Sequence, residues 1–349
     1  MARSLLIGGI EVSDNTPPFV IAEVGHNHQG SVETCERIFE AAAKAGANSV
    51  KLQKRFNRTL YTPEFFNSPY QGPTSFGDTY GEHREALEFG EREYRHLITF
   101  AKKLDLVFFA TAFDFQSVDF LVNLGVPAIK LASGDLRSTP LIRYAARTGL
   151  PLVMSTGGAN LTDVKLAMRN VDETNVALLQ CTAAYPAEAE HMNLRVIESY
   201  RNLYPKTVIG LSSHDRGIAF PTVAAALGAR IIEKHFTLDR SMKGTDHAFS
   251  LEPTGMEKLV RDLNLVVRAL GTGEKNFLDV EKSGIRKMGK MIVYSRELHP
   301  GHIITEQDIE IRSPMDGVSA NQWDDIIGDR KSTRLNSSHE WISRMPSSA

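Results

Sequence analysis

The sequence predicts an α/β protein whose main domain is a (β/α)8 TIM barrel. Short apolar runs, eight in all, alternate with longer amphipathic segments between residues 19 and 272. Runs that are apolar at nearly every position fit strands covered on both faces, as in a parallel sheet flanked by helices. The glycine fingerprint of a dinucleotide fold is absent after the first run, where EVGHNHQGS stands. A closed barrel therefore fits better than an open doubly wound sheet.

The predicted strands follow one another at the spacing of strand–helix units. They cover residues 19–25, 48–54, 106–111, 127–133, 151–157, 176–182, 207–213 and 230–236. After the first strand, residues 31–47 have the pattern of a helix with Ser31 as its N-cap and Gly46 at its end. Residues 55–89 interrupt the alternation with aromatics, prolines and glycines. An insertion of this length is either a functional lid or partner-facing loop, or an ordinary packed surface loop.

Three segments follow the barrel domain, which we place at residues 1–272. Residues 273–287 are predicted to form a linker around a helical turn, and residues 288–328 a small second domain with a Pro-Gly turn and short strands. The last segment, residues 329–349, is polar and without periodicity, and it resembles a translated sequencing adapter. We therefore expect an artefactual, disordered tail that leaves the small domain truncated.

Composition and charge exclude several classes of function. The formal net charge of -2 offers no basic surface for nucleic acid or an anionic membrane. No signal peptide and no apolar run long enough to span a bilayer is found. Two cysteines, Cys35 and Cys181, are too few for a disulfide framework and suit a reducing compartment. We expect a cytoplasmic protein.

Polar residues stand at the carboxyl end of every predicted strand. In strand order they are Glu23, Asn27 and His28; Lys51 and Gln53; Thr111 and Asp114; Lys130, Ser133 and Asp135; Ser155 and Thr156; Gln180, Thr182 and Tyr185; Ser213 and His214; Glu233 and His235. A single such residue is most often a hydrogen-bonded structural residue. Because the carboxyl ends of barrel strands meet at one mouth, where active sites are built, the whole set predicts a catalytic mouth.

The residue types at this mouth limit the chemistry. Two histidines on neighbouring strands, with carboxylates nearby, suit a divalent transition metal with open positions. Lysines and hydroxyls suit a small anion that carries phosphate and carboxylate. Together they indicate a Lewis-acid condensation or elimination. A metal-dependent barrel hydrolase or isomerase, with His26 and His28 of GHNHQ as ligands, would leave the lysines unexplained.

Seven motifs extend this interpretation: IAEVGHNHQGS, VKLQK, KLASGD, STGG, QCTAAYP, GLSSHD and EKHFTLD. In this order, from Phe19 to Gly328, the chain resembles the sialic acid synthase family. The resemblance implies a barrel followed by an antifreeze-like (SAF) domain, here residues 288–328. It also implies condensation of phosphoenolpyruvate with an N-acylated amino sugar, giving a nine-carbon 2-keto acid and phosphate. Members form homodimers in which each small domain caps the partner's barrel.

The resemblance also assigns roles to residues. His214 and His235 are implied as ligands of Mn2+, or of another divalent metal such as Mg2+ or Co2+, and as part of the catalytic set with Glu23 and Asp135. The implied phosphoenolpyruvate-binding residues are Lys51, Thr111, Lys130, Ser133, Ser155 and Ser213. The implied sugar-binding residues are Gln53, Tyr185, Asp246 and, from the partner's small domain, Arg312.

The acceptor sugar is left open by the residues. Free N-acetylmannosamine is the expected substrate, which would make the chain an N-acetylneuraminate synthase. TYGEHREALEF and GTDHAFSLEP also resemble the animal-type synthase, which uses N-acetylmannosamine 6-phosphate. A second phosphate would need basic contacts in the insertion, for which the candidates are Arg55, Arg58, His83 and Arg84. Legionaminate or pseudaminate synthesis, and a catalytically silent barrel that only binds sugar phosphates, are the remaining alternatives.

Overall fold

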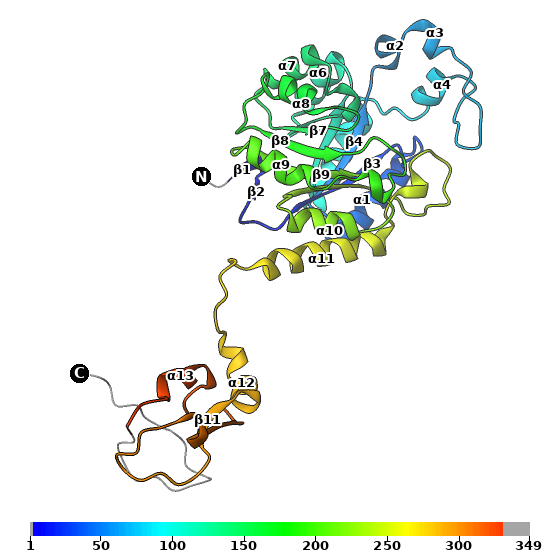
Figure 1. Ribbon diagram of the computed structural model, residues 1–349. Coiled ribbons are helices and arrows are strands. Elements are labelled where there is room, and N and C mark those ends of the chain that lie inside the picture. Colours follow the sequence, from blue (N-terminus) through cyan, green and yellow to red (C-terminus); the bar gives the residue numbers. More distant parts are fainter. Residues whose placement is uncertain (1–2, 331–349) are drawn as a thin grey trace. The chain divides into compact units, whose positions relative to one another are not determined.

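The computed structural model describes residues 3–330, and the chain divides into two compact units between Gly271 and Thr272. In the first unit, parallel strands close into a barrel in the order β10-β3-β4-β5-β6-β7-β8-β9 (Figure 1). The strands are β3 (Phe19–Gly25), β4 (Ser49–Lys54), β5 (Val107–Ala112), β6 (Ile129–Leu131), β7 (Leu152–Ser155), β8 (Val176–Cys181), β9 (Val208–Ser213) and β10 (Ile231–His235). Each overlaps one predicted run, so the predicted barrel is confirmed.

Helices alternate with these strands and cover the outside of the barrel (Figure 1). They are α1 (Val32–Lys44), α5 (Glu91–Lys103), α6 (Phe115–Leu124), α7 (Thr139–Ala146), α8 (Leu161–Met168), α9 (Val196–Leu203), α10 (Ala219–Ala226) and α11 (Pro253–Leu270). The predicted cap of the first helix is confirmed, because the Ser31 side chain accepts a hydrogen bond from the backbone N–H of Thr34. None of the helices within residues 3–330 combines the length and apolar character that a membrane span requires.

The insertion after β4 is structured. It contains three short helices, α2 (Asn57–Leu60), α3 (Pro63–Phe66) and α4 (Tyr80–Glu85). Figure 1 shows it standing out from the barrel beyond the carboxyl end of β4. Aromatic side chains pack against one another inside it: Tyr80 contacts Tyr61, Phe65 and Tyr70 with ring centroids 4.6–5.3 Å apart. The insertion is thus a packed element beside the mouth.

An N-terminal hairpin precedes the barrel and is absent from the sequence-based prediction. Its strands, β1 (Ser4–Ile7) and β2 (Ile10–Ser13), pair antiparallel. Gly8 and Gly9 form the turn between them with φ of +58° and +85°, which glycine adopts without strain. Leu5, Ile7 and Val12 are buried in the same apolar core as the barrel strands and helices.

The second unit contains α12 (Lys282–Met288), β11 (Met291–Tyr294), β12 (Ile309–Arg312) and α13 (Trp323–Ile326). The two strands pair antiparallel. Its own small core consists of Ile292, Tyr294, Leu298, Ile304, Ile309 and Ile326. Arg330 forms an antiparallel bridge with Ile303. The rest of the predicted tail, residues 331–349, lies outside the described residues.

Candidate active site

A buried group of opposite charges occupies the centre of the barrel mouth. Lys51 Nζ on β4 lies 2.6 Å from Glu23 Oε2 on β3 and donates to Thr111 Oγ1 on β5 at 2.8 Å. Glu233 on β10 lies 3.9 Å from Lys51 Nζ and 4.0 Å from the ammonium of Lys130 on β6. These side chains converge because alternate residues of a parallel strand face the barrel interior. The mouth therefore holds two cations, each close to a carboxylate.

The two carboxylates of this group differ in acidity. Burial raises the pKa of Glu23, although Lys51 opposes the shift. Burial would also raise the pKa of Glu233, but Lys130 and Lys51 outweigh it and hold that pKa below its ordinary value. Glu233 is thus a permanent counter-ion, whereas Glu23 is the carboxyl better able to take up a proton. Such a separation is how one site obtains both an acid and a base.

Hydroxyl groups surround the two lysines. Lys130 Nζ donates to Ser155 Oγ on β7 at 2.7 Å. Ser133, in the turn η1 (Ser133–Asp135) after β6, accepts a hydrogen bond from the backbone N–H of Gly157 at 3.0 Å. Ser213, the last residue of β9, donates to the carboxylate of Asp215, which also accepts from Lys234 Nζ at 2.9 Å. The predicted lysines and the hydroxyls of Thr111, Ser133 and Ser155 therefore lie along one rim from β4 to β7. Ser213 does not belong to it: its neighbour Ser212 donates to Glu233 Oε1 at 3.1 Å, so Ser213 points to the opposite face of β9.

His214 and His235 lie side by side, with ring centroids 5.4 Å apart. The Nδ1 of His214 donates to the carbonyl oxygen of Thr182 at 2.9 Å, which leaves its Nε2 unprotonated. The buried Nδ1 of His235 has no hydrogen-bond partner within residues 3–330 and lies 3.8 Å from Asp246 Oδ2. Burial lowers the pKa of both rings, that of His214 to about 4, so both are neutral at physiological pH.

These two imidazoles fit a divalent metal. A neutral ring whose second nitrogen is fixed by a backbone carbonyl is the usual arrangement of a metal-binding histidine. Among residues 3–330, no three or more His, Cys, Asp or Glu side chains form a metal-binding group. Two protein nitrogens would leave most coordination positions open for water and substrate.

Aromatic side chains cover the two histidines. Tyr185 stacks on His214 with ring centroids 4.1 Å apart, while its side chain remains 56% exposed. Phe249 lies 5.0 Å from the His235 ring and 5.5 Å from that of Tyr185. This arrangement keeps one wall of the mouth apolar and gives Tyr185 access to a bound molecule.

Asp135 presents a carboxyl oxygen, Oδ2, that is buried and without a hydrogen-bond partner among residues 3–330. Burial raises its pKa to about 6, although the charges of Arg55 and Lys130 act in the opposite direction. A carboxylate with a pKa near neutrality suits a general acid or base.

Arg312 is the one predicted site residue that belongs to the second unit. It lies on β12, and its guanidinium forms an ion pair with Glu310 at 2.6 Å. Its role in a partner's barrel, and the homodimer itself, stay predictions.

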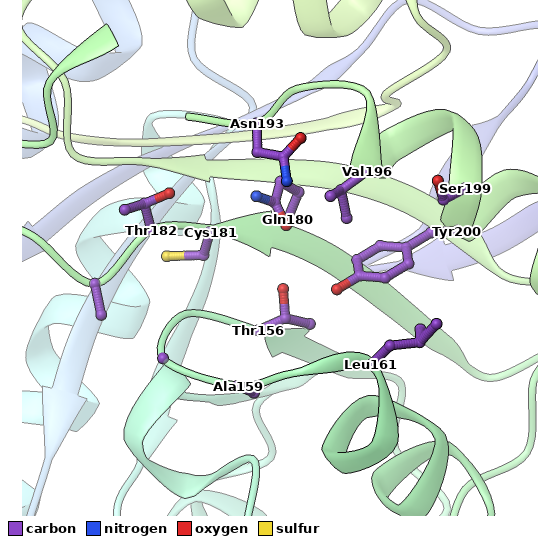
Figure 2. A pocket seen from close by; sticks show the side chains of 12 residues that line it. Thr156, Ala159, Leu161, Gln180, Cys181, Thr182, Asn193, Val196, Ser199 and Tyr200 are labelled. Carbon is purple, nitrogen blue, oxygen red and sulfur yellow. The ribbon is translucent and has the colours of Figure 1, made fainter. Parts of the chain in front are cut away.

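A cavity of about 550 Å³ lies beside the mouth, between the β7–α8 loop, the end of β8 and α9 (Figure 2). Cys181, which lines it, places Sγ 4.0 Å from His214 Nδ1. The hydroxyl groups of Thr156 and Tyr200 and the amide of Gln180 point into it, beside the apolar Leu161 and Val196 (Figure 2). Three residues that the sequence places at the mouth, Thr156, Gln180 and Thr182, line this cavity instead, whereas none of the residues assigned to phosphate, sugar or metal does. The converging charges of the mouth therefore identify the candidate active site, not this neutral cavity.

Glu233 belongs to the charged group of the mouth, although the sequence assigned it no specific role. Its signal was present, because Glu233 and His235 stand two positions apart and so share one face of a strand. What the sequence could not show is that both lysines approach this one carboxylate.

Comparisons with known proteins agree with this geometry. The NeuB family model matches residues 38–275, and the SAF domain model matches residues 289–342. The chain is 38% identical over 309 residues to N-acetylneuraminate-9-phosphate synthase of Homo sapiens, covering 88% of this chain and 86% of that protein. It is 33% identical to N,N'-diacetyllegionaminic acid synthase of Campylobacter jejuni, covering 88% and 94%. The solved structure of N-acetylneuraminic acid synthetase from Leptospira borgpetersenii, in complex with citrate, is similar with a TM-score of 0.72 at 32% identity, covering 82% and 96%.

Proposed function

The chain belongs to the NeuB family of sialic acid synthases, and on that basis we propose that it condenses phosphoenolpyruvate with N-acetylmannosamine, free or phosphorylated. The products are a nine-carbon 2-keto acid of the N-acetylneuraminate type and inorganic phosphate. The observation that supports this most directly is the mouth itself, where the strand ends bring two lysines with their hydroxyl partners and two neutral histidines to one end of the barrel.

Phosphoenolpyruvate binds through its two anionic groups. Lys51 and Lys130 supply the cations, and the hydroxyls of Thr111, Ser133 and Ser155 supply hydrogen bonds. On β9 this role passes from the predicted Ser213 to Ser212, whose hydroxyl faces Glu233. Because the rim is buried, these interactions are stronger than they would be in water. Glu23 takes up a proton when the anion arrives, since its pKa is already raised by burial. This proton uptake lowers the negative charge beside the bound substrate.

The reaction forms one bond and breaks another. C3 of phosphoenolpyruvate attacks the aldehyde carbon of the open-chain sugar, and the aldehyde oxygen takes a proton. Water adds at C2 and gives up a proton, so the two transfers balance. The new C2 hydroxyl then loses its proton to the departing phosphate as the bond between C2 and the bridging oxygen breaks. In this proposal Glu23 delivers the first proton, and Asp135 accepts the proton of the attacking water.

His214 and His235 would hold a divalent cation, which we propose to be Mn2+. When bound, it supplies Lewis-acid polarisation of the aldehyde. Gln53 and Asp246 hold the sugar hydroxyls around the same point. Their side chains meet at Gly25, where a methyl group in place of hydrogen would lie 3.3 Å from Gln53 Nε2 and 3.5 Å from Asp246 Oδ2. Glycine at this position therefore keeps room for the sugar.

The raised pKa of Asp135 predicts an acid limb in the pH profile. Below about pH 6 its carboxyl is protonated and cannot accept the proton of water, so kcat/KM should fall about tenfold per pH unit. The phosphate of the substrate titrates near the same pH. The variant Asp135→Asn distinguishes the titration of the enzyme from that of the substrate. Its kcat should be about 10²- to 10⁴-fold lower, and the pH dependence that remains should be that of the substrate phosphate alone. The variant Asp135→Glu, which retains a carboxyl group, should retain the acid limb of the pH profile that is due to the enzyme. An Asn variant with wild-type rate and profile would contradict the role.

The proposal is tested by phosphate release from phosphoenolpyruvate in the presence of Mn2+, with and without N-acetylmannosamine or its 6-phosphate. Sugar-dependent release, with mass-spectrometric detection of the nine-carbon product, is the expected result. Turnover with 2,4-diacetamido sugars instead would favour the legionaminate or pseudaminate alternatives. Binding of the sugar phosphate without any release would favour a silent barrel.

A further inference from the structure

Two arginines of the insertion meet on one histidine beside the mouth. Arg55, directly after β4, places Nη1 3.2 Å from His26 Nε2, and Arg84, on α4, places Nη1 3.1 Å from His26 Nδ1. Arg55 and His26 are each only 7% exposed. Within residues 3–330, no carboxylate lies within 4.0 Å of a side-chain nitrogen of either arginine. The cluster of Arg55, His26 and Arg84 therefore contains two cations, one buried and one partly buried, without a direct counter-ion.

This cluster also has more hydrogen-bond donors than acceptors. Burial and the two guanidinium charges lower the pKa of His26 well below its ordinary value, so its ring is neutral. A neutral imidazole offers one acceptor and one donor, whereas a guanidinium can only donate. One of the two arginines therefore faces a ring N–H, and its own N–H there lacks an acceptor. An incoming anion with several acceptor oxygens would correct both the charge and the hydrogen bonding.

The cluster is connected to the predicted sugar-binding residues. Arg55 Nη2 donates to Gln53 Oε1 at 2.7 Å, and Gln53 Nε2 donates to Glu23 Oε1 at 2.7 Å. The guanidinium of Arg55 also stacks on Phe113, with Cζ 3.6 Å from the ring centroid. A sugar held at its hydroxyls by Gln53 would thus extend its far end toward the two arginines.

We infer that Arg55 and Arg84 form a subsite for a phosphate ester on the sugar carbon farthest from the aldehyde. This inference rests on the proposed function. Phosphoenolpyruvate contributes three carbons to the nine-carbon product, so C6 of the sugar becomes C9. The acceptor selected in this way is N-acetylmannosamine 6-phosphate, in contrast to the free sugar that the sequence alone favours. Two guanidinium groups converging on one point match the geometry and charge of a phosphate monoester.

Of the four basic residues that were candidates for a second phosphate, only Arg55 and Arg84 belong to the cluster. Arg58 instead stacks on Phe66, with Cζ 4.9 Å from the ring centroid, and no hydrogen bond or ion pair joins it to the cluster in the described part of the chain. His83 is buried, and its Nδ1 accepts a hydrogen bond from the backbone N–H of Phe76. Arg58 therefore supplies a matched control, an arginine of the same insertion outside the subsite.

The test compares kcat/KM for the 6-phosphate and for the free sugar, with phosphoenolpyruvate and Mn2+ present. We expect the wild-type chain to prefer the 6-phosphate. Arg84→Met should reduce the ratio of the two kcat/KM values by about 10- to 150-fold, mainly through KM of the 6-phosphate. Arg84→Lys should give an intermediate ratio, and it replaces the Met variant if that one does not fold. Arg58→Met should leave the ratio at its wild-type value.

Three results would overturn the subsite: a wild-type preference for the free sugar, an unchanged ratio in both Arg84 variants, or the same loss in Arg58→Met. Absence of phosphate release with either sugar would instead count against the proposed function. In that event calorimetric binding of the two sugars decides the subsite. Tighter binding of the 6-phosphate that is lost in Arg84→Met would support it, and equal binding would refute it.

Discussion

Replacing Lys51 by methionine is expected to lower kcat/KM for phosphoenolpyruvate by about 10³-fold. Its ammonium contacts Glu23 at 2.6 Å, Thr111 at 2.8 Å and Glu233 at 3.9 Å, all of them buried. Without it, one substrate anion loses a cation and two buried carboxylates lose their shared counter-ion. Removing one partner of a buried ion pair costs about 3–5 kcal/mol. A loss of this size in transition-state stabilisation corresponds to a decrease in rate of about 10³-fold. Steady-state kinetics with variable phosphoenolpyruvate measures it.

Lys54→Met separates the catalytic effect from a loss of stability. Lys54 lies on the same strand, is 6% exposed and pairs with Glu88 at 3.1 Å, but it contacts Phe56 and Phe120 and not the mouth. Both variants should unfold at lower temperature than the wild type, because each leaves a buried carboxylate unpaired. Only Lys51→Met should also lose turnover per folded molecule. If a folded Lys51→Met protein had the wild-type KM for phosphoenolpyruvate, the assignment of Lys51 to the anion site would be wrong.

The barrel could be predicted because its strands are apolar on both faces. A run such as 207–213, which is apolar at most positions, is typical of a strand in a parallel sheet that is covered on both faces. The corresponding strand β9 (Val208–Ser213) is buried throughout. The N-terminal hairpin was missed although its Gly8-Gly9 turn is a hairpin signal. Its strands are four residues each, and their burial comes from packing on a barrel that the local sequence does not describe.

The candidate site was predictable as a set, whereas its internal contacts were not. Parallel topology alone brings the strand ends together, so Lys51, Thr111 and Lys130 could be assigned to one mouth. By contrast, Arg55 and Arg84 are 29 positions apart in an irregular insertion, and His26 comes from another loop altogether. Their convergence follows from how the insertion folds back on the barrel, which no periodicity encodes. The same holds for Glu233, whose two lysine contacts cross the barrel interior.

Replacing His214 by alanine is expected to abolish measurable turnover, with kcat at least about 10³-fold below wild type. His214 and His235 are neighbouring neutral imidazoles at the mouth, and the Nδ1–H of His214 is fixed on the carbonyl oxygen of Thr182. Loss of a group that hydrogen-bonds a metal ligand already lowers metal affinity by about 10- to 100-fold. Loss of the ligand itself should therefore lower the affinity further. Mn2+ binding, followed by the electron paramagnetic resonance signal of the free ion, measures this independently of turnover.

Two further variants show whether His214 acts through a metal or only through packing. Tyr185→Leu removes the ring stacked on His214 at 4.1 Å but leaves both imidazoles in place, so it should weaken sugar binding while Mn2+ affinity stays near wild type. His96→Ala removes an exposed histidine that contacts Glu36, and it should change neither property. If His214→Ala turned over and bound Mn2+ like the wild type, the metal assignment would be wrong. The two histidines would then serve as neutral hydrogen-bonding groups for the aldehyde, and the lysine rim would have to supply all of the electrostatic stabilisation.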